Sequence, residues 1–327
     1  MQMKVLYIGG TGQISFDCIH ESVRAGHEVY VYNRGNHNEG LPDSCRLIRG
    51  DIFDEEAYFK LAAYNFDVIC QFHLFQPWEL ARDLRLFTGY CDQYVFISTA
   101  SAYQKPPRHY MITEEVPLEN PFWEYSRNKA EMERLLQAQS ALPYTIVRPS
   151  HTSRSRLITA TGGADIVAQR MLAGKPVILL GDGTSLWTIT RSEEFAPPFV
   201  KLLGNDGALN DYFHLTSDNA YSWNHIYQAL GRVLGVEPSI VHVPTETLIR
   251  YRPAWEGPLL GDKTWSALFD NRKIKSVVGD FTCHTTLDGF MQRLLPYFLK
   301  RAETYQPDLE YEALLDRIIA EQSQLGR

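Results

Sequence analysis

The fold is decided by residues 4–23, which read KVLYIGGTGQISFDCIHESV. The apolar run 4–8 has the character of a buried strand, and the glycine-rich turn after it leads into a stretch with helical spacing of its apolar residues. Gly9 permits the tight turn, and Gly12 lets backbone amides approach a pyrophosphate at the positive end of the helix. The alternative is an ordinary glycine-rich turn between a strand and a helix. The residues expected to contact a dinucleotide here are Gly9, Gly12, Gln13 and Ile14.

Short apolar runs alternate with helix-length stretches through the first 150 residues. This alternation is typical of βαβ units, whose right-handed crossovers generate a parallel sheet with helices on both faces. The predicted fold is therefore α/β, with a doubly wound parallel (Rossmann) sheet over residues 1–150. A smaller, mixed α/β substrate-binding lobe is expected over residues 151–327, interleaved with the first. The predicted strands lie near residues 5–8, 29–32, 47–48, 68–72, 94–97 and 144–147.

Composition narrows the class of protein. The 327 residues include 44% hydrophobic and 22% charged side chains, which excludes a disordered chain. With 32 Lys and Arg against 39 Asp and Glu, the net charge of −7 opposes a broad nucleic-acid footprint. No apolar run approaches the roughly 18 residues of a membrane span, and no secretory signal is expected. The five cysteines lack the spacing of a metal site, so we expect reduced thiols, no metal and a cytoplasmic protein.

The end of the second predicted strand bears on the choice of cofactor. A carboxylate at this place normally binds the adenosine ribose of NAD, but here the strand ends in Asn33 and Arg34. A guanidinium accommodates a 2′-phosphate through charge-assisted hydrogen bonds, so the pattern slightly favours NADP(H); the alternative is a solvated arginine in a turn. Asp51 and Ile52 follow the third strand and suit an adenine site. A helix N-cap near Asp54 explains the spacing equally well.

Three residues are candidates for proton chemistry. Thr99 follows the fifth predicted strand, at the carboxyl edge where doubly wound sheets bind ligands. Tyr125 and Lys129 begin a predicted helix, and their i, i+4 spacing puts the phenol and the ammonium on one face. A nearby ammonium lowers the pKa of a phenol, so Tyr125 is expected to exchange a proton with a substrate hydroxyl that Thr99 orients. A Tyr-x-x-x-Lys pair also occurs by chance in many helices.

Taken together, the glycine turn, Asp51-Ile52, Thr99 and the Tyr-x-x-x-Lys pair resemble the extended short-chain dehydrogenase/reductase (SDR) family, specifically its NAD-dependent epimerase/dehydratase branch. The resemblance covers most of the chain. It is strong over residues 1–150 and weaker beyond them.

This resemblance implies roles for particular residues. Tyr125 would be the acid/base, Lys129 would hold the nicotinamide ribose and lower the pKa of the tyrosine, and Thr99 would be the matching Ser/Thr. Phe72 and Pro149 would line the cofactor. The resemblance also implies a homodimer.

The sequence departs from the family at the substrate side. Nucleotide-sugar 4,6-dehydratases carry Asp-Glu after the catalytic Thr, whereas Ala100-Ser101 stands here, so dehydration is not expected. Where many members have an arginine that grips a diphosphate, this chain has Trp187, whose ring can stack on a base or sugar face. His151 follows the sixth strand, where substrate is expected, although a structural histidine explains it as well. Lys263 is either a phosphate contact or a surface charge. The candidate substrate residues are Ser101, His151 and Trp187.

The expected function is hydride transfer between NAD(P) and a secondary alcohol or ketone of a sugar-like substrate, which some family members bind as a nucleotide sugar. The residues leave open whether the protein is a reductase or an epimerase. The glycine turn, Asn33-Arg34 and residues 261–271 also look like a divergent SDR branch that includes chloroplast stem-loop RNA-binding proteins. RNA binding, or non-catalytic NAD(P) binding, is therefore the alternative. The acidic net charge and the complete catalytic set argue against it.

Overall fold

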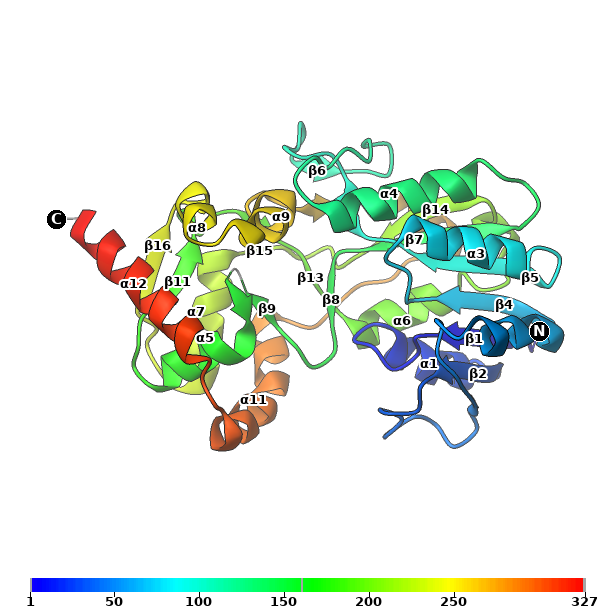
Figure 1. The fold of residues 1–327 in the computed structure, drawn as a ribbon, viewed down its shortest axis with the longest axis horizontal. Coiled ribbons are helices and arrows are strands. Elements are labelled where there is room, and N and C mark those ends of the chain that lie inside the picture. Colours follow the sequence, from blue (N-terminus) through cyan, green and yellow to red (C-terminus); the bar gives the residue numbers. More distant parts are fainter. Residues whose placement is uncertain (1, 160, 326–327) are drawn as a thin grey trace.

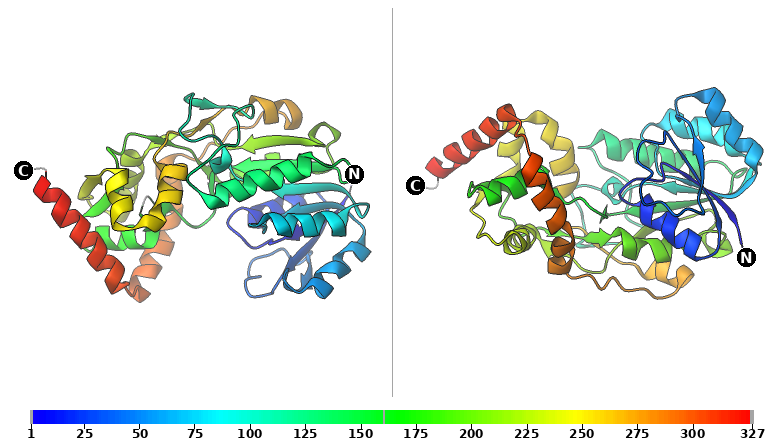
Figure 2. Two further views of the ribbon diagram at one scale, coloured as in Figure 1. Left: turned by 45° about the horizontal axis from the view of Figure 1, so that its top comes forward. Right: turned by 90° about the horizontal axis from the view of Figure 1, so that it is seen from below.

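The computed structural model describes residues 2–159 and 161–325. The chain forms two lobes that lie side by side along the longest axis of the molecule (Figure 1). The N-terminal lobe is built on one large sheet, and the C-terminal lobe carries the last two helices, an arrangement that is also seen in two further views (Figure 2). The short strands β8 (His151–Ser153) and β13 (Ile189–Arg191) pair in parallel between the lobes (Figure 1).

One parallel sheet forms the centre of the N-terminal lobe. Its strands are β1 (Lys4–Ile8), β2 (Glu28–Asn33), β3 (Arg46–Arg49), β4 (Phe66–Gln71), β5 (Cys91–Ile97), β7 (Tyr144–Pro149) and β14 (Asp211–Leu215). The order across the sheet is β14-β7-β5-β4-β1-β2-β3, and every neighbouring pair is parallel. Because β1 pairs with both β2 and β4, the connections diverge from β1, and such switch points are where doubly wound sheets bind ligands. The predicted Rossmann fold is confirmed.

Helices cover both faces of this sheet. They are α1 (Ser15–Arg24), α2 (Glu55–Phe59), α3 (Pro77–Phe87), α4 (Glu124–Gln137), α6 (Ser192–Val200) and α10 (Arg272–Val278). Figure 1 shows α1 and α6 on one face, and α3 and α4 on the other. Side chains of β1 alternate accordingly: Val5 and Tyr7 join the core beneath α1 and α6, whereas Leu6 and Ile8 join the core beneath α3 and α4. The strand is apolar throughout because both of its faces are buried.

Part of the N-terminal lobe comes from beyond residue 150. Strand β14 extends the sheet by pairing with β7, with Phe213 opposite Val147. Phe195 and Phe199 of α6, and Ile274 of α10, are buried in the core beneath α1. The central sheet therefore does not end at residue 150, where the sequence pattern places the boundary, because three later segments complete its edge and one of its faces.

The C-terminal lobe has its own hydrophobic core, in which the parallel strands β11 and β16 pack against α12, β11 also packs against α5, and α7 packs against α11. Its main elements are α5 (Ala164–Leu172), β11 (Val177–Leu180), α7 (Trp223–Leu234), β16 (Ile240–Val243), α8 (Thr245–Tyr251), α9 (Glu256–Pro258), α11 (Leu287–Thr304) and α12 (Leu309–Leu325). The remaining strands form short pairs: β6 (Met111–Ile112) with β17 (Leu268–Phe269), β9 (Ile158–Thr159) with β10 (Gly162–Gly163), and β12 (Leu186–Trp187) with β15 (Tyr221–Ser222). Within residues 2–159 and 161–325, no helix combines the length and the apolar character that a membrane crossing requires.

Candidate active site

A cleft of about 1130 Å³ lies between the lobes at the carboxyl edge of the sheet. Its walls are the turns that follow β1, β4, β5 and β7, and residues of the C-terminal lobe face them. Parallel strands deliver the residues after them to one edge, so segments far apart in the sequence meet here. The predicted site residues that line the cleft are Gly9, Gly12, Gln13, Ile14, Phe72, Thr99, Tyr125, Lys129, Pro149 and His151.

The turn after β1 keeps its backbone open to the cleft. Gly9 has a φ of +79°, and a Cβ at this position would lie 3.0 Å from the Cβ of His73. Ser15 Oγ donates to the Gly9 carbonyl at 2.9 Å and accepts from the Gly12 amide at 3.0 Å, which closes the turn. Ile14 occupies the N-cap of α1 and offers no side-chain acceptor to the amides of the first turn. Those amides therefore suit an anionic ligand.

Gln13 lines the cleft, but its side chain is bound to the protein. Its Oε1 accepts from the Ser155 amide at 3.0 Å, and its Nε2 donates to Ser155 Oγ at 3.2 Å. Gln13 therefore ties the glycine turn to the loop after β8, and its backbone is the part that suits a cofactor.

A second cavity, of about 290 Å³, lies where β2 and β3 end. The predicted residues Asn33, Arg34, Asp51 and Ile52 all line it. The side chain of Asn33 braces the turn around Arg34, because its Oδ1 accepts from the Gly35 amide and its Nδ2 donates to Asn38 Oδ1, each at 2.8 Å. This cavity also contains Gly9 and Gly12 in its wall, so it is continuous with the glycine turn of the cleft.

Arg49, which sequence reasoning missed, places a second guanidinium beside this cavity, against the turn around Gly35. It pairs with Asn33 across β2 and β3, and a Cβ on Gly35 would lie 2.5 Å from its Nε. Arg49 therefore packs against the turn that carries Arg34, and both side chains are exposed. Two neighbouring guanidinium groups favour an anion at this end of the cavity. The sequence feature that could have predicted this position is that Arg49 comes at the end of the third predicted strand, as Asn33 does at the end of the second, so the two residues come to the same edge of a parallel sheet.

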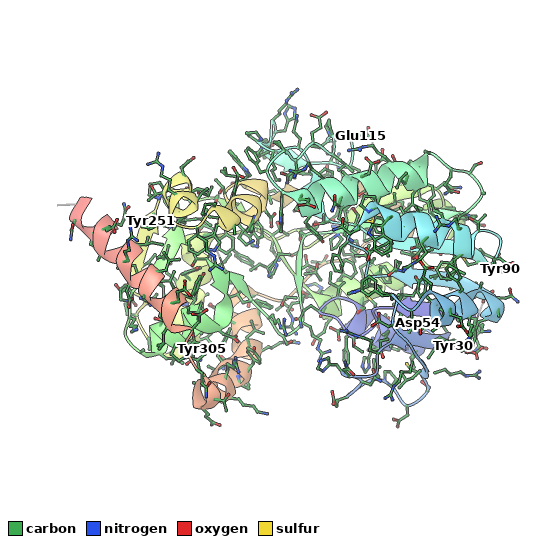
Figure 3. All side chains as sticks on the ribbon, in the orientation of Figure 1. Tyr30, Asp54, Tyr90, Glu115, Tyr251 and Tyr305 are labelled. Atoms are coloured by element: carbon green, nitrogen blue, oxygen red, sulfur yellow. The ribbon has the colours of Figure 1, made fainter. Side chains whose placement is uncertain are left out.

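The N-cap alternative applies to Asp54 and not to Asp51. Asp54, labelled on the N-terminal lobe in Figure 3, caps α2 by accepting from the Ala57 amide at 3.1 Å. Asp51 lies in the wall of the second cavity and accepts from the Phe53 amide at 3.0 Å. Asp51 and Asp54 therefore have separate tasks.

Thr99, Tyr125 and Lys129 meet in the cleft. Thr99 follows β5, and Tyr125 and Lys129 lie in the first turns of α4. The Tyr125 hydroxyl is hydrogen-bonded to Thr99. The Nζ atom of Lys129 lies 5.8 Å from the centre of the Tyr125 ring and donates to the Ile97 carbonyl at 2.7 Å. With 2% of its surface exposed, Lys129 is a buried cation beside a phenol.

Burial controls the ionisation of this pair. It raises the pKa of Tyr125 to about 12, although the hydrogen bond with Thr99 lowers that pKa. Burial also lowers the pKa of Lys129 to about 7, although the carboxylate of Glu133 raises it. The prediction that the ammonium makes Tyr125 acidic is therefore wrong. The loss of water around the phenol is the largest cause, and the negative charge of Asp262 adds to the increase.

A buried ion pair fixes the helix that carries Lys129. Glu133, one turn further along α4, receives two hydrogen bonds from Arg148 of β7, with Nη2 to Oε2 at 2.6 Å and Nε to Oε1 at 3.0 Å. Ser98 donates a further hydrogen bond to Glu133. Such a two-pronged contact fixes direction as well as distance, so α4 is held against β5 and β7. The sequence alone does not distinguish Glu133 from an exposed charged residue on a helix, so this role was not predicted.

A third cavity, of about 140 Å³, shares Thr99, Tyr125 and Pro149 with the cleft. We call it the inner cavity, bounded by Ser101, Lys105, His151, Trp187 and Asp262. The predicted substrate residues Ser101, His151 and Trp187 thus lie together. The hydroxyl of Ser101 is already hydrogen-bonded to Thr99 at 3.0 Å and to Ser126 at 2.7 Å, so it positions Thr99.

The two lobes also bring buried charges to the site that the sequence did not reveal. Lys263 lines the cleft with 6% of its surface exposed, which contradicts its interpretation as a surface charge. Lys105 and Asp262 line the inner cavity. Lys105 belongs to no recognisable motif, and Asp262 lies in the stretch 261–271 without having been singled out. Among the residues that the structure describes, no cluster of three His, Cys, Asp or Glu side chains is suited to hold a metal ion.

Comparisons with known proteins agree with this architecture. Residues 78–212 match the model of the NAD dependent epimerase/dehydratase family. The chain is 27% identical to the 2′-dehydrokanamycin reductase of Streptomyces kanamyceticus, over 75% of its own length and 70% of that protein. It is 23% identical to the chloroplast stem-loop binding protein of 41 kDa b of Arabidopsis thaliana, over 74% of its own length and 66% of that protein.

Solved structures show the same fold. The UDP-glucuronic acid 4-epimerase of Bacillus cereus, determined with UDP-glucuronic acid and NAD, superposes with a TM-score of 0.74. The two chains are 15% identical, and the match covers 91% of this chain and 99% of the epimerase. Fold and cleft define an enzyme of the extended SDR type. Within that class, residues 78–212 are similar to the NAD dependent epimerase/dehydratase family.

Proposed function

We propose that this protein is an NADP(H)-dependent reductase that acts on a ketone of a sugar-like substrate, with Tyr125 as the proton donor. The observation that carries the proposal is the meeting of Thr99, Tyr125 and Lys129 in a cleft that the glycine turn also lines. The relative named 2′-dehydrokanamycin reductase supports reduction as the direction of the reaction.

The residues along the cleft fit a dinucleotide. The backbone of the glycine turn and the free amides of α1 would hold the pyrophosphate, and Asp51 and Ile52 would contact the adenine. Lys129 would hold the nicotinamide ribose, with Phe72 and Pro149 beside the ring. When bound, the nicotinamide supplies the hydride.

The task of the protein's own side chains is to give a proton to the carbonyl oxygen. Tyr125 keeps its proton at neutral pH because burial raises its pKa to about 12, and a ketone reductase needs that state. Thr99 is placed to donate a hydrogen bond to the same oxygen, and the Lys129 ammonium stabilises the phenolate that remains. An epimerase would use the same tyrosine first as a base and then as an acid.

The pH dependence of reduction follows from these two pKa values. Tyr125 stays protonated well above neutral pH, whereas Lys129 loses its charge as the pH rises through about 7. We therefore expect kcat/KM for NADPH, which reports on the free enzyme, to be highest below pH 7 and to fall about tenfold per pH unit above it. Initial rates at limiting NADPH and saturating ketone measure this profile. A rate that is constant to pH 9 would contradict the role of the ammonium.

The preference for NADP(H) rests on the second cavity. We expect the double variant Arg34→Ala, Arg49→Ala to weaken NADPH binding by about 10- to 100-fold, the usual size of charge-assisted hydrogen bonds, and to leave NADH binding within about twofold. Titration of the cofactor fluorescence gives both dissociation constants. Arg46→Ala is the matched control, because Arg46 belongs to the same strand but pairs with Glu28. Equal weakening of both cofactors would remove the argument for a 2′-phosphate.

Two simple experiments test the proposal against its alternatives. Native mass spectrometry of the purified protein distinguishes a reductase, which releases its cofactor each cycle, from an epimerase, which retains NAD. A gel-shift assay with structured RNA at physiological salt tests the alternative of RNA binding, which the similarity to the Arabidopsis thaliana stem-loop binding protein suggests. The homodimer implied by the family resemblance stays a prediction, which light scattering checks.

A further inference from the structure

The wall of the inner cavity contains a largely buried lysine, Lys105, whose ammonium has no hydrogen bond or close ion pair with any described residue. Lys105 has 5% of its surface exposed. Within residues 2–159 and 161–325, its ammonium donates no hydrogen bond, and no carboxylate lies within 4.0 Å of it. Burial lowers the pKa of Lys105, and Asp262 is the acidic group that opposes this effect. A buried ammonium that nothing pairs is costly, so a partner from outside the chain would stabilise it.

A second lysine, Lys263, lies nearby in the wall of the cleft, next to Asp262 of the inner cavity. Lys263 Nζ is 3.9 Å from Asp262 Oδ2 and donates a long hydrogen bond of 3.4 Å to the Pro258 carbonyl. Burial raises the pKa of Asp262, which weakens its negative charge, although both lysines lower that pKa. Burial lowers the pKa of Lys263 as well. By their number, two amines stand against one carboxyl group around the inner cavity.

Two ring nitrogens of the same wall also lack partners. Trp187 Nε1 and His151 Nε2 are inaccessible, and neither forms a hydrogen bond within the part of the chain that the structure describes. Trp187 has 4% of its surface exposed, and its ring lies 6.3 Å from that of His151. An indole N–H can only donate. Because both nitrogens are inaccessible, a ligand in the inner cavity can pair with them only if the rings shift on binding.

The size of the inner cavity limits what it can hold. Its volume of about 140 Å³ is below the roughly 300–1,000 Å³ of pockets that take a whole drug-sized ligand. It therefore suits one substituent of a substrate whose remainder lies in the cleft. The two spaces meet at Thr99 and Tyr125, so a group in the inner cavity is attached close to the reacting carbon.

We infer that the substrate carries an anionic group, a carboxylate or a phosphate, which Lys105 binds in the inner cavity, with Lys263 adding positive charge from the adjoining wall of the cleft. This inference rests on the proposed function for the position of the ketone at Tyr125. The substrate class is then an acidic keto sugar, and a cationic amino sugar is excluded.

Binding of ketoses of different charge tests the inference. The protein, saturated with NADP⁺ so that no turnover occurs, is titrated by calorimetry with D-fructose, 2-keto-D-gluconate, fructose 1-phosphate and 1-amino-1-deoxy-D-fructose, in which each charged group is attached next to the ketone carbon. We expect one or both anionic ketoses to bind about 10- to 100-fold more tightly than fructose, and the tighter of the two tells a carboxylate from a phosphate. We expect the amino ketose to bind most weakly.

Lys105→Met is the decisive variant. It should reduce the preference for the anionic ketose to within about threefold of fructose, and it should raise Tm because it removes an unpaired buried charge. Lys201→Met changes an exposed lysine that follows α6 in the N-terminal lobe. It should alter neither the preference for the anionic ketose nor Tm. Lys263→Met should also weaken binding of the anionic ketoses relative to fructose.

The inference is overturned if the anionic ketoses bind no better than fructose, if the amino ketose binds best, or if Lys105→Met keeps the preference. A fall in Tm of Lys105→Met would also overturn it, because the lysine would then be a structural partner of Asp262. Reduction is assayed separately with NADPH. Tighter binding of the anionic ketoses without any reduction would support the inference and contradict the proposed ketone reduction. Equal reduction of neutral and anionic ketoses would support the proposed reduction and contradict the inference.

Discussion

Replacing Tyr125 with Phe is expected to lower kcat for ketone reduction by about 10²- to 10⁴-fold, the usual contribution of a positioned general acid. The change removes the proton that Tyr125 would give to the carbonyl oxygen, and it removes the hydrogen bond with Thr99. The ring, its contact with Lys129 and the walls of the cleft remain. Cofactor affinity should therefore stay within about twofold, so that kcat and kcat/KM for the ketone fall together.

The matched control is Tyr90→Phe. Tyr90 is labelled in Figure 3 at the end of the N-terminal lobe away from the C-terminal lobe, and it is about half exposed. Steady-state rates and NADPH titrations of both variants give the comparison. If Tyr125→Phe keeps more than a tenth of the wild-type kcat, Tyr125 is not the proton donor.

Replacing Lys129 with Met is expected to lower kcat/KM by about 10²- to 10³-fold, comparable to the loss of one donor that stabilises a developing negative charge. Lys129 would stabilise the Tyr125 phenolate and hold the nicotinamide ribose, so both the affinity for NADPH and kcat should decrease. The break near pH 7 in the wild-type profile should disappear in this variant, because the titrating group is gone.

The same variant should be more stable than the wild type in acid. Burial lowers the pKa of Lys129 from 10.5 to about 7, so between these values the unfolded chain binds a proton that the folded chain does not. Stability of the wild type therefore rises with pH over this window, and the cost of the buried charge is fully present below pH 7. Thermal unfolding should show a gain in Tm for Lys129→Met that is largest below pH 7 and shrinks above it. A loss of Tm at every pH would show that the ammonium is needed for the fold.

The arrangement of strands was predictable to a large extent. Buried parallel strands are apolar on both faces, so the runs near residues 5–8 and 94–97 stand out from the helices between them. Strand β14 was missed because its five residues include Asp211 and Tyr212 at the edge of the sheet, where a continuous apolar run is not required. The way in which α6 and β14 return to the first lobe depends on packing across the whole chain, which periodicity does not encode.

The part of the candidate site that comes from a single sequence motif was predictable. The i, i+4 spacing of Tyr125 and Lys129 places both side chains in the cleft, as expected. The ionisation of these groups was not predictable, because the depth of burial decides it and the sequence does not specify that depth. Lys105 and Asp262 were missed for another reason: they come from separate loops, and the inner cavity exists only where the two lobes meet.

The central claim is that Tyr125 gives a proton to a ketone held beside a nicotinamide in the cleft. Its most direct test follows the transfer of deuterium from 4-deuterated NADPH to the four ketoses named above, with mass spectrometry of the alcohol products. We predict that the wild type places deuterium on the former carbonyl carbon of at least one ketose, and that Tyr125→Phe does so at least about 10²-fold more slowly. Transfer to none of the ketoses by the wild type with NADPH bound, or equal transfer by wild type and variant, would contradict it.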